Sequence, residues 1–189
     1  PVSTCLSGPS AGVAAAAAIA LKAGFPNVAT FDVGGTSTDI GLIINGEIRI
    51  SAERDVAGYP VRTPSLDISV IGAGGGSLAV VDAAGGLSVG PQSAGAIPGP
   101  AAYGNGGKGA TLTDANLILG RLDADTGLVD GSTKLDLRAA ENAMTEQVAK
   151  PLQITLERAA AGVLSVAVAN IARAIRSASS ERGHDLRDM

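Results

Sequence analysis

The sequence predicts an α/β fold: a mixed sheet with antiparallel β-hairpins, flanked by helices and carrying a glycine-rich insertion. Two apolar strands enclose the sequence DVGGTSTD at 32–39, and the Asn45-Gly46 pair separates the second strand from a third. Asn-Gly between two strands is a strong signal for a two-residue hairpin. Beyond residue 113, apolar residues recur at the spacing of helices. These three observations favour a sheet of short-range hairpins next to helices.

The first predicted segment, residues 1–57, is a connecting helix followed by a three-stranded unit. An Ala-rich run predicts a helix over 9–23 that ends at Gly24 and whose small side chains allow close packing against a sheet. Lys22 interrupts this apolar run, which is too short to span a bilayer, so we expect no membrane segment and no membrane partner. Strands are predicted at 27–33, 38–44 and 47–56.

The second predicted segment, residues 58–112, is a glycine-rich insertion of loops and short strands. Glycine and proline crowd into it, with short strands expected at 66–71 and 78–83. It is too rich in glycine for regular structure and too apolar for a disordered linker. Long ordered loops of this kind are usually functional.

The third predicted segment, residues 113–189, is the helical part of the same domain. A helix over 113–122 is expected to start at a Thr113 or Asp114 cap. Two further helices are predicted at 136–152, capped by Asp136 and closing near Pro151, and at 155–183.

The amino-acid composition limits the cellular compartment and the classes of binding partner that are expected. The 189 residues suffice for one domain, and the net charge of −4 without a basic run makes nucleic acid a poor partner. Cys5 is the single cysteine, so no internal disulfide can form, and a reduced, cytoplasmic setting is expected.

The DVGGTSTD sequence is the strongest candidate site. Glycine turns leave backbone N–H groups pointing outward with no Cβ to block a phosphate, and hydroxyl groups add further donors. Asp32 would repel a bare phosphate, but it suits a Mg²⁺ ion or its waters between carboxylate and phosphate. Asp39 could orient the turn or the water shell of the metal. The alternative is a tight hairpin in which Asp32 and Thr36 satisfy each other. The candidate phosphate-binding residues are Gly34, Gly35, Thr36, Ser37 and Thr38.

Two levels of resemblance follow from these motifs. DVGGTSTD between two strands resembles a phosphate loop of the actin-like ATPase superfamily, which implies half of an actin-like (ribonuclease H-like) ATPase domain. More narrowly, LSGPSAGV, TFDVGGTSTDIGLI, IGAGGGSLAVVDAAGG, TLTDANLILGRL and ARAIRSASSERGHDLRD are similar, in order, to the hydantoinase A/5-oxoprolinase family, which also includes acetone carboxylase subunits. The similarity covers nearly all of residues 3–188.

The resemblance implies ATP-dependent opening of a cyclic amide such as a hydantoin or 5-oxoproline. Asp32 would be the catalytic residue that organises Mg²⁺ (or Mn²⁺) or a water, with Asp39 as a second metal ligand, and the glycine-threonine turn would hold the ATP phosphates. The alternatives are a subunit of an acetone-carboxylase-like ATP-dependent ligase, and a non-catalytic actin-like ATPase chaperone or reactivase. Family members often work with a hydantoinase B-like subunit or domain, so a homo- or hetero-oligomer is expected.

The family pattern also contains parts that this chain lacks. Relatives carry an earlier Asp-Gly-Gly-Thr loop and a later adenosine loop, and neither occurs between Pro1 and Met189. Both ends of the chain therefore look like cuts in a longer protein. An ATP site needs both lobes, so we expect the isolated segment to bind nucleotide poorly and to be inactive.

Other candidate residues carry weaker signals. The glycine-rich sequence at 72–77 departs from the dinucleotide fingerprint, so this loop either shapes the substrate or nucleotide cleft or is purely structural. The resemblance favours the cleft for Gly74, Gly75, Gly76 and Ser77, as cofactor-binding residues. Asp67 is either a ligand or an acid that braces a loop. Ser69 stands where many relatives carry His, which puts a metal or acid–base role there in doubt. His184, the only histidine, is expected to be solvated.

Overall fold

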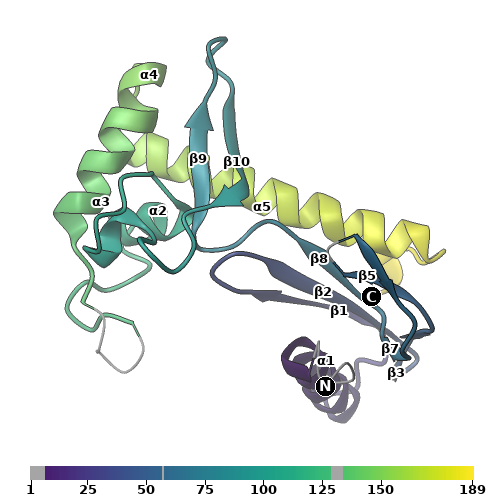
Figure 1. Cartoon of the computed structure of the whole chain (residues 1–189). Helices are drawn as coiled ribbons and strands as arrows, with labels where there is room; N and C mark the ends of the chain where they lie inside the picture. Colours follow the sequence, from purple (N-terminus) through teal and green to yellow (C-terminus); the bar gives the residue numbers. More distant parts are fainter. Residues whose placement is uncertain (1–6, 57, 129–133) are drawn as a thin grey trace. The chain divides into compact units, whose positions relative to one another are not determined.

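The computed structural model describes residues 7–56, 58–128 and 134–189 (Figure 1). The chain forms two compact units. The first unit contains Pro1–Asp32, Asp39–Val70 and Arg173–Met189, and the second contains Val33–Thr38 and Ile71–Ala172. The segments predicted from sequence (1–57, 58–112 and 113–189) have other bounds, and that division stays a prediction. Cys5 lies outside the described residues.

The first unit contains a helix and a four-stranded sheet. Helix α1 (Ser7–Lys22) is followed by β1 (Val28–Val33), β2 (Thr38–Ile44) and β3 (Glu47–Ile48), which lie in the order β1-β2-β3. Only four residues join β1 to β2, too few for a parallel crossover, so this pair is antiparallel. The predicted hairpin at Asn45 and Gly46 is confirmed, since both residues have the positive φ that its turn requires. One buried hydrophobic cluster here contains Val13, Ala17, Ile43 and Ile68.

The single strand predicted over 47–56 is wrong, because the chain changes partner at Arg49. After β3, β4 (Ile50–Ser51) pairs with β7 (Ser65–Leu66), and β5 (Arg54–Val56) pairs with β6 (Tyr59–Val61). The Asp67 N–H donates to the Arg49 carbonyl at 2.9 Å. The predicted strand 66–71 is likewise divided at Asp67, after which β8 (Ile68–Ile71) pairs with β2.

A hairpin and a helical layer form the second unit. Strands β9 (Ser77–Val81) and β10 (Leu87–Ser93) are antiparallel, and β10 was not predicted because glycine and proline interrupt its sequence. Asp82 Oδ1 accepts from the N–H groups of Ala84 and Gly86, both at 2.8 Å, and so fixes the turn. The main core of this unit contains Ala79 and Val89 from the hairpin, together with alanine, valine and leucine side chains from the helices.

The helices of the second unit largely follow the predicted order. They are η2 (Ala101–Tyr103), α2 (Leu112–Ile118), α3 (Leu137–Met144), the π-helical turn η3 (Thr145–Ala149), α4 (Lys150–Leu152) and α5 (Leu156–Glu181), with η4 (Leu186–Asp188) after them in the first unit. The Asp136 cap is confirmed, since its Oδ1 accepts from the Ala139 N–H at 2.9 Å. The helix predicted at 136–152 is thus present as α3, η3 and α4 in direct succession.

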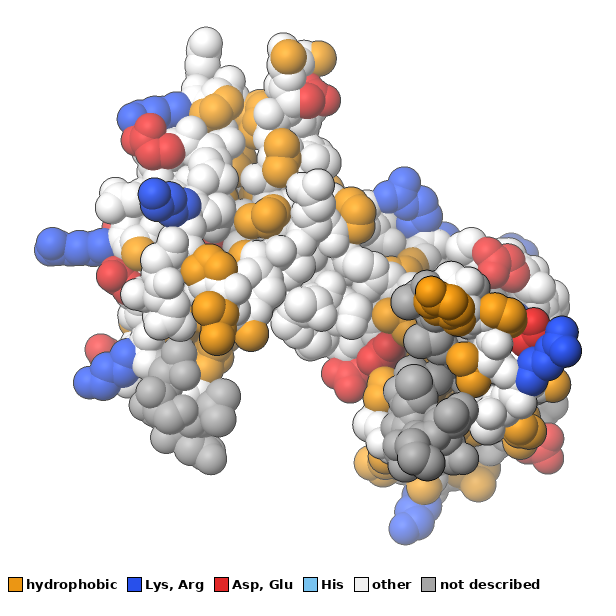
Figure 2. Space-filling model, in the orientation of Figure 1, with side chains coloured by type: hydrophobic (Ala, Val, Ile, Leu, Met, Phe, Trp, Pro, Cys, Tyr) orange, Lys and Arg blue, Asp and Glu red, His pale blue; other side chains and the backbone are white. Residues whose placement is uncertain are grey.

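Helix α5 is long and apolar enough, by length and composition, to cross a membrane, a test that soluble core helices also pass. It buries Ala159, Ala160, Val163 and Ala167 in the core of the second unit. Hydrophobic side chains are also visible on the surface (Figure 2), and Phe25 is among the exposed ones. The absence of a membrane partner stays a prediction.

The start of α2 is held by a buried carboxylate. The cap is Thr111, not Thr113 or Asp114, and Asp114 closes a capping box by accepting from the Thr111 N–H at 2.8 Å. Its other oxygen accepts from the Ala102 N–H at 2.7 Å. Burial raises the pKa of the Asp114 carboxyl, while hydrogen bonds from Thr111 and Ala102 act in the opposite direction. This group's contribution to stability therefore falls as the pH rises through the raised pKa.

We predict that Asp114→Ala in the intact protein loosens both the α2 start and η2. The substitution leaves the Ala102 and Thr111 N–H groups buried without an acceptor, which costs about 1–3 kcal/mol for each group. Hydrogen exchange followed by mass spectrometry should show the amides of residues 102 and 111 exchanging about tenfold faster or more. Asp125→Ala, at an exposed acid, is the matched control, and equal protection in the two variants would contradict the prediction.

Candidate functional site

The turn between β1 and β2 is held open on one side. In a closed two-residue hairpin, the flanking residues exchange two hydrogen bonds. Here the Gly34 N–H donates to the Ser37 carbonyl at 2.8 Å, but the Gly34 carbonyl accepts from the Gly75 N–H at 2.9 Å. The second bond of the hairpin is therefore replaced by a contact to a distant part of the chain. We call residues 34–37 the open loop.

Three successive main-chain amides of the open loop are unused. Within the part of the chain that the structure describes, the N–H groups of Gly35, Thr36 and Ser37 donate to no protein acceptor. Gly35 and Thr36 are exposed, and Ser37 is half-buried. Consecutive amides without a protein partner at a glycine turn are suited to binding an anion. The Gly34 amide is different, because it is already bonded to Ser37, so its predicted phosphate contact through N–H is not formed by this geometry.

Residues 74–77, which we call the bracing loop, pack directly against the open loop. A Cβ at Gly74 would stand 2.7 Å from the Gly34 carbonyl oxygen and 2.8 Å from the Ser37 nitrogen. The Gly76 N–H donates to the Gly35 carbonyl at 2.6 Å. The glycines at these positions therefore allow two backbones to touch.

The amides of the bracing loop are all engaged within the protein. The Gly74 N–H donates to Ser77 Oγ at 2.9 Å, and the Ser77 N–H donates to the Gly74 carbonyl at 3.0 Å. The N–H groups of Gly75 and Gly76 bond to the open loop. The cofactor-binding role predicted for these four residues stays a prediction, and the role that the geometry gives them is support.

Thr38 has a similar supporting position. Its side chain is fully buried, and its hydroxyl donates to the Ala73 carbonyl at 2.5 Å. The phosphate contact predicted for this hydroxyl is therefore not part of the described geometry. Thr36 and Ser37, in contrast, make no side-chain hydrogen bond within the described residues, so the alternative pairing of Asp32 with Thr36 is not found among them.

The two predicted metal ligands lie in the first unit. The Asp32 side chain is exposed, and one of its oxygens would stand 3.9 Å from a Cβ at Gly12 of α1. Asp39 is half-buried and already takes part in an interaction within the chain. Among the described residues, no three His, Cys, Asp or Glu side chains gather as a metal cluster. One or two carboxylates with phosphate oxygens and waters are the usual Mg²⁺ donors, so an exposed Asp32 fits that chemistry.

Asp67 is part of an ion pair within the first unit. Arg182 donates from Nε to Asp67 Oδ2 at 2.7 Å and from Nη2 to Asp67 Oδ1 at 2.5 Å. The same Nη2 reaches Ser69 Oγ at 3.1 Å. These bonds to Asp67 raise the pKa of Arg182. The bracing role weighed for Asp67 thus has a partner 115 residues away along the chain, which the sequence pattern gave no means of finding.

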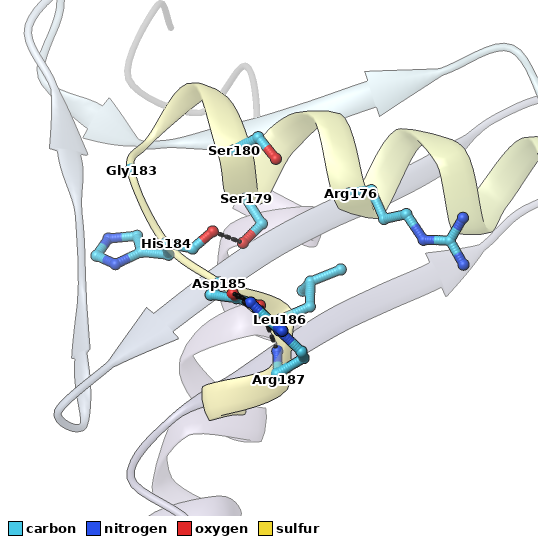
Figure 3. Close-up of a pocket in the computed structure, with 8 residues that line it drawn as sticks. All are labelled: Arg176, Ser179, Ser180, Gly183, His184, Asp185, Leu186 and Arg187. Carbon is cyan, nitrogen blue, oxygen red and sulfur yellow. Dashed lines mark hydrogen bonds and ion pairs between the residues drawn. The ribbon is translucent and has the colours of Figure 1, made fainter.

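A cavity of about 540 Å³ lies at the end of α5 in the first unit (Figure 3). Ser179 Oγ donates to the His184 carbonyl at 2.7 Å and closes the helix end. Arg187 pairs with Asp185, and Arg176 extends away from that pair (Figure 3). His184 is half-buried and lines this cavity. None of the predicted site residues lines it.

Comparisons with a family model, with related sequences and with solved structures all place the chain in the same protein family. The family model described as Hydantoinase/oxoprolinase matches residues 1–189. The chain is 45% identical to caprolactamase subunit alpha of Pseudomonas jessenii, over 96% of this chain and 26% of that protein. The crystal structure of the ATP-dependent caprolactamase from Pseudomonas jessenii superposes with a TM-score of 0.85 at 43% identity, covering 99% of this chain and 27% of that one. Nucleotide-free acetone carboxylase superposes with a TM-score of 0.83 at 34% identity, covering 96% and 26%.

The chain spans about a quarter of the length of these relatives. The fold and the ancestry are thereby shown for this segment.

We predict that Gly74→Ala in the intact protein displaces the open loop. Its Cβ would meet backbone atoms at 2.7–2.8 Å, and overpacking of this kind costs about 1–3 kcal/mol. Hydrogen exchange at Gly34, Gly75 and Gly76 should become at least several-fold faster. Gly162→Ala is the control, because its Cβ would meet only Leu87 Cδ2 at 3.4 Å and alanine favours helix α5. Unchanged protection in Gly74→Ala would show that the two loops are not in close contact.

Proposed function

Because the chain belongs to the hydantoinase/oxoprolinase family, we propose that it supplies the phosphate-binding loop of an enzyme that opens cyclic amides at the expense of ATP. The observation that carries this proposal is the row of amides at Gly35, Thr36 and Ser37, which donate to no acceptor within the described part of the chain. Such amides are of no use to the fold itself, but they fit phosphate oxygens. The caprolactamase of Pseudomonas jessenii is ATP-dependent, which supports the choice of nucleotide.

The proposed chemistry follows from the stability of amides. A cyclic amide resists attack by water. Phosphorylation of its carbonyl oxygen by ATP, with release of ADP, would make the carbonyl carbon more electrophilic, so that water could add, the C–N bond could break and phosphate could be released. Phosphoryl transfer mainly requires positioning and neutralisation of charge. The amides of the open loop would hold phosphate oxygens, and no Cβ at Gly35 obstructs their approach. Asp32 would hold Mg²⁺ (or Mn²⁺), which supplies charge neutralisation when bound, and Asp39 would help to orient it.

Several finer features belong to the same proposal. We assign the strand–open loop–strand arrangement to half of an actin-like ATPase domain, on the pattern DVGGTSTD between two antiparallel strands. The caprolactamase relative is an alpha subunit, which supports a hydantoinase B-like partner in a hetero-oligomer. A cytoplasmic location rests on the single cysteine alone.

ATP-driven carboxylation of a ketone is the second candidate function. It is supported by the structural similarity to acetone carboxylase at a TM-score of 0.83. Both reactions would use ATP to activate an oxygen atom of the substrate, so the open loop has the same task in each. The higher identity to caprolactamase, 43% against 34%, favours the cyclic amide.

The test is ATP turnover by the intact protein with its companion subunit, measured as phosphate release. Caprolactam, 5-oxoproline and hydantoin are compared with acetone plus bicarbonate. The proposal predicts stimulation by at least one cyclic amide, and Asp32→Ala should abolish that turnover while leaving the fold intact, because the metal would lose its carboxylate. Asp125→Ala, at another exposed acid, should turn over normally.

Two results would count against the proposal. Full turnover by Asp32→Ala would remove this carboxylate from the mechanism. Stimulation by acetone and bicarbonate alone would favour the ligase.

A further inference from the structure

We propose that Thr113 is a positioning residue for the open loop and that it acts through the peptide groups on either side of Gly75. Thr113 lies at the start of α2, is buried, and approaches no residue of the DVGGTSTD sequence directly in any described hydrogen bond. The inference rests on the proposed function only where it concerns ATP, and its structural part stands separately.

Gly75 is bonded from both ends. Its N–H donates to the Gly34 carbonyl at 2.9 Å. Its carbonyl accepts twice from Thr113, from the N–H at 2.8 Å and from the hydroxyl at 2.9 Å. Thr113 therefore holds Gly75 in place, and the Gly75 N–H occupies the Gly34 carbonyl that would otherwise accept from the Ser37 N–H.

The Thr113 N–H is available because of how α2 is capped. The first N–H groups of a helix have no partner within the helix. The Thr111 hydroxyl accepts from the Asp114 N–H, which leaves the Thr113 N–H to seek an acceptor elsewhere. Gly75 provides that acceptor. A cap on α2 and a brace on the open loop are thus parts of one hydrogen-bond network.

The contact is also close enough to exclude other side chains. A Cβ at Gly75 would stand 2.8 Å from Thr113 Oγ1. Only glycine at 75 lets the hydroxyl reach the carbonyl without displacement. The pairing of Gly75 with a hydroxyl at 113 therefore sets the position of the bracing loop against α2, and the bracing loop sets the position of the open loop.

The test uses Thr113→Val, which keeps the shape of the side chain and removes its hydroxyl. Thr113→Ser restores the hydroxyl, and Thr145→Val is the control, because the Thr145 hydroxyl makes no hydrogen bond within the described residues. If Thr113→Val does not fold, Thr113→Ala takes its place. All variants are made in the intact protein.

Two quantities are measured. Without nucleotide, hydrogen exchange at Gly75 and Gly76 should be about fivefold faster in Thr113→Val, the effect of one typical hydrogen bond, while the β9–β10 hairpin keeps its protection. With Mg²⁺ and ATP, kcat/KM for ATP should fall about fivefold, mainly through KM. Thr113→Ser should stay within twofold of the natural protein in both measurements.

The possible results distinguish a failure of the inference about Thr113 from a failure of the proposed function. Wild-type exchange in Thr113→Val, or a loss equally large in Thr113→Ser, would overturn the inference. Faster exchange with an unchanged KM for ATP would also overturn it, because the loop would then have no bearing on nucleotide. Failure of the proposed function itself is recognised independently, by full turnover in Asp32→Ala.

Discussion

The hydrogen bond from the Gly75 N–H to the Gly34 carbonyl is the constraint on which the candidate site depends. It takes the carbonyl that would otherwise close the β1–β2 hairpin, and the Ser37 amide is thereby left without a partner in the described chain. The bond can form only because Gly74 carries no Cβ between the two backbones. Gly74, which has no functional side chain, thus allows the contact that orients the backbone groups of the open loop.

The surroundings of this bond form a series of supports. The Asp114 carboxylate holds the start of α2, and Thr113 next to it holds Gly75. The buried Thr38 hydroxyl fixes the start of β2 to Ala73, just before the bracing loop. Each support uses a buried polar group that is satisfied by a partner, which makes the arrangement costly to disturb. Rigid support of an open amide row is what phosphate recognition requires, since a preorganised site loses less free energy when it binds.

Local patterns in the sequence were sufficient for much of this fold. The hairpin at Asn45 and Gly46, helix α1 and the Asp136 cap depend on neighbouring residues only, and all three are present. The same local reasoning gave the turn at 34–37 and its two strands. It failed at Arg49, where the chain leaves one strand pair and joins another with a segment distant in sequence. It also failed in β10, because glycine and proline interrupt the sequence pattern of a strand.

In the candidate site, too, local features could be predicted from the sequence and contacts between distant segments could not. The amides of Gly35, Thr36 and Ser37, which have no acceptor among the described residues, belong to the glycine turn, so their position could be anticipated. Thr38 was expected to face phosphate, yet its place on the strand turns it inward to Ala73. Gly74 and its neighbours contact the open loop, and their predicted role in lining a cleft stays a prediction. Contacts between segments some forty residues apart leave no local pattern, so Thr113 could not be found from the sequence.

A structure of the intact protein with Mg²⁺ and a non-hydrolysable ATP analogue tests the central claim most directly. The decisive measurement is the distance from the nitrogens of Gly35, Thr36 and Ser37 to the nearest phosphate oxygens. The account predicts hydrogen-bond distances of about 3 Å, with the Gly75 to Gly34 bond retained. Phosphates bound elsewhere, or these three amides bonded to protein acceptors from the rest of the molecule, would contradict it.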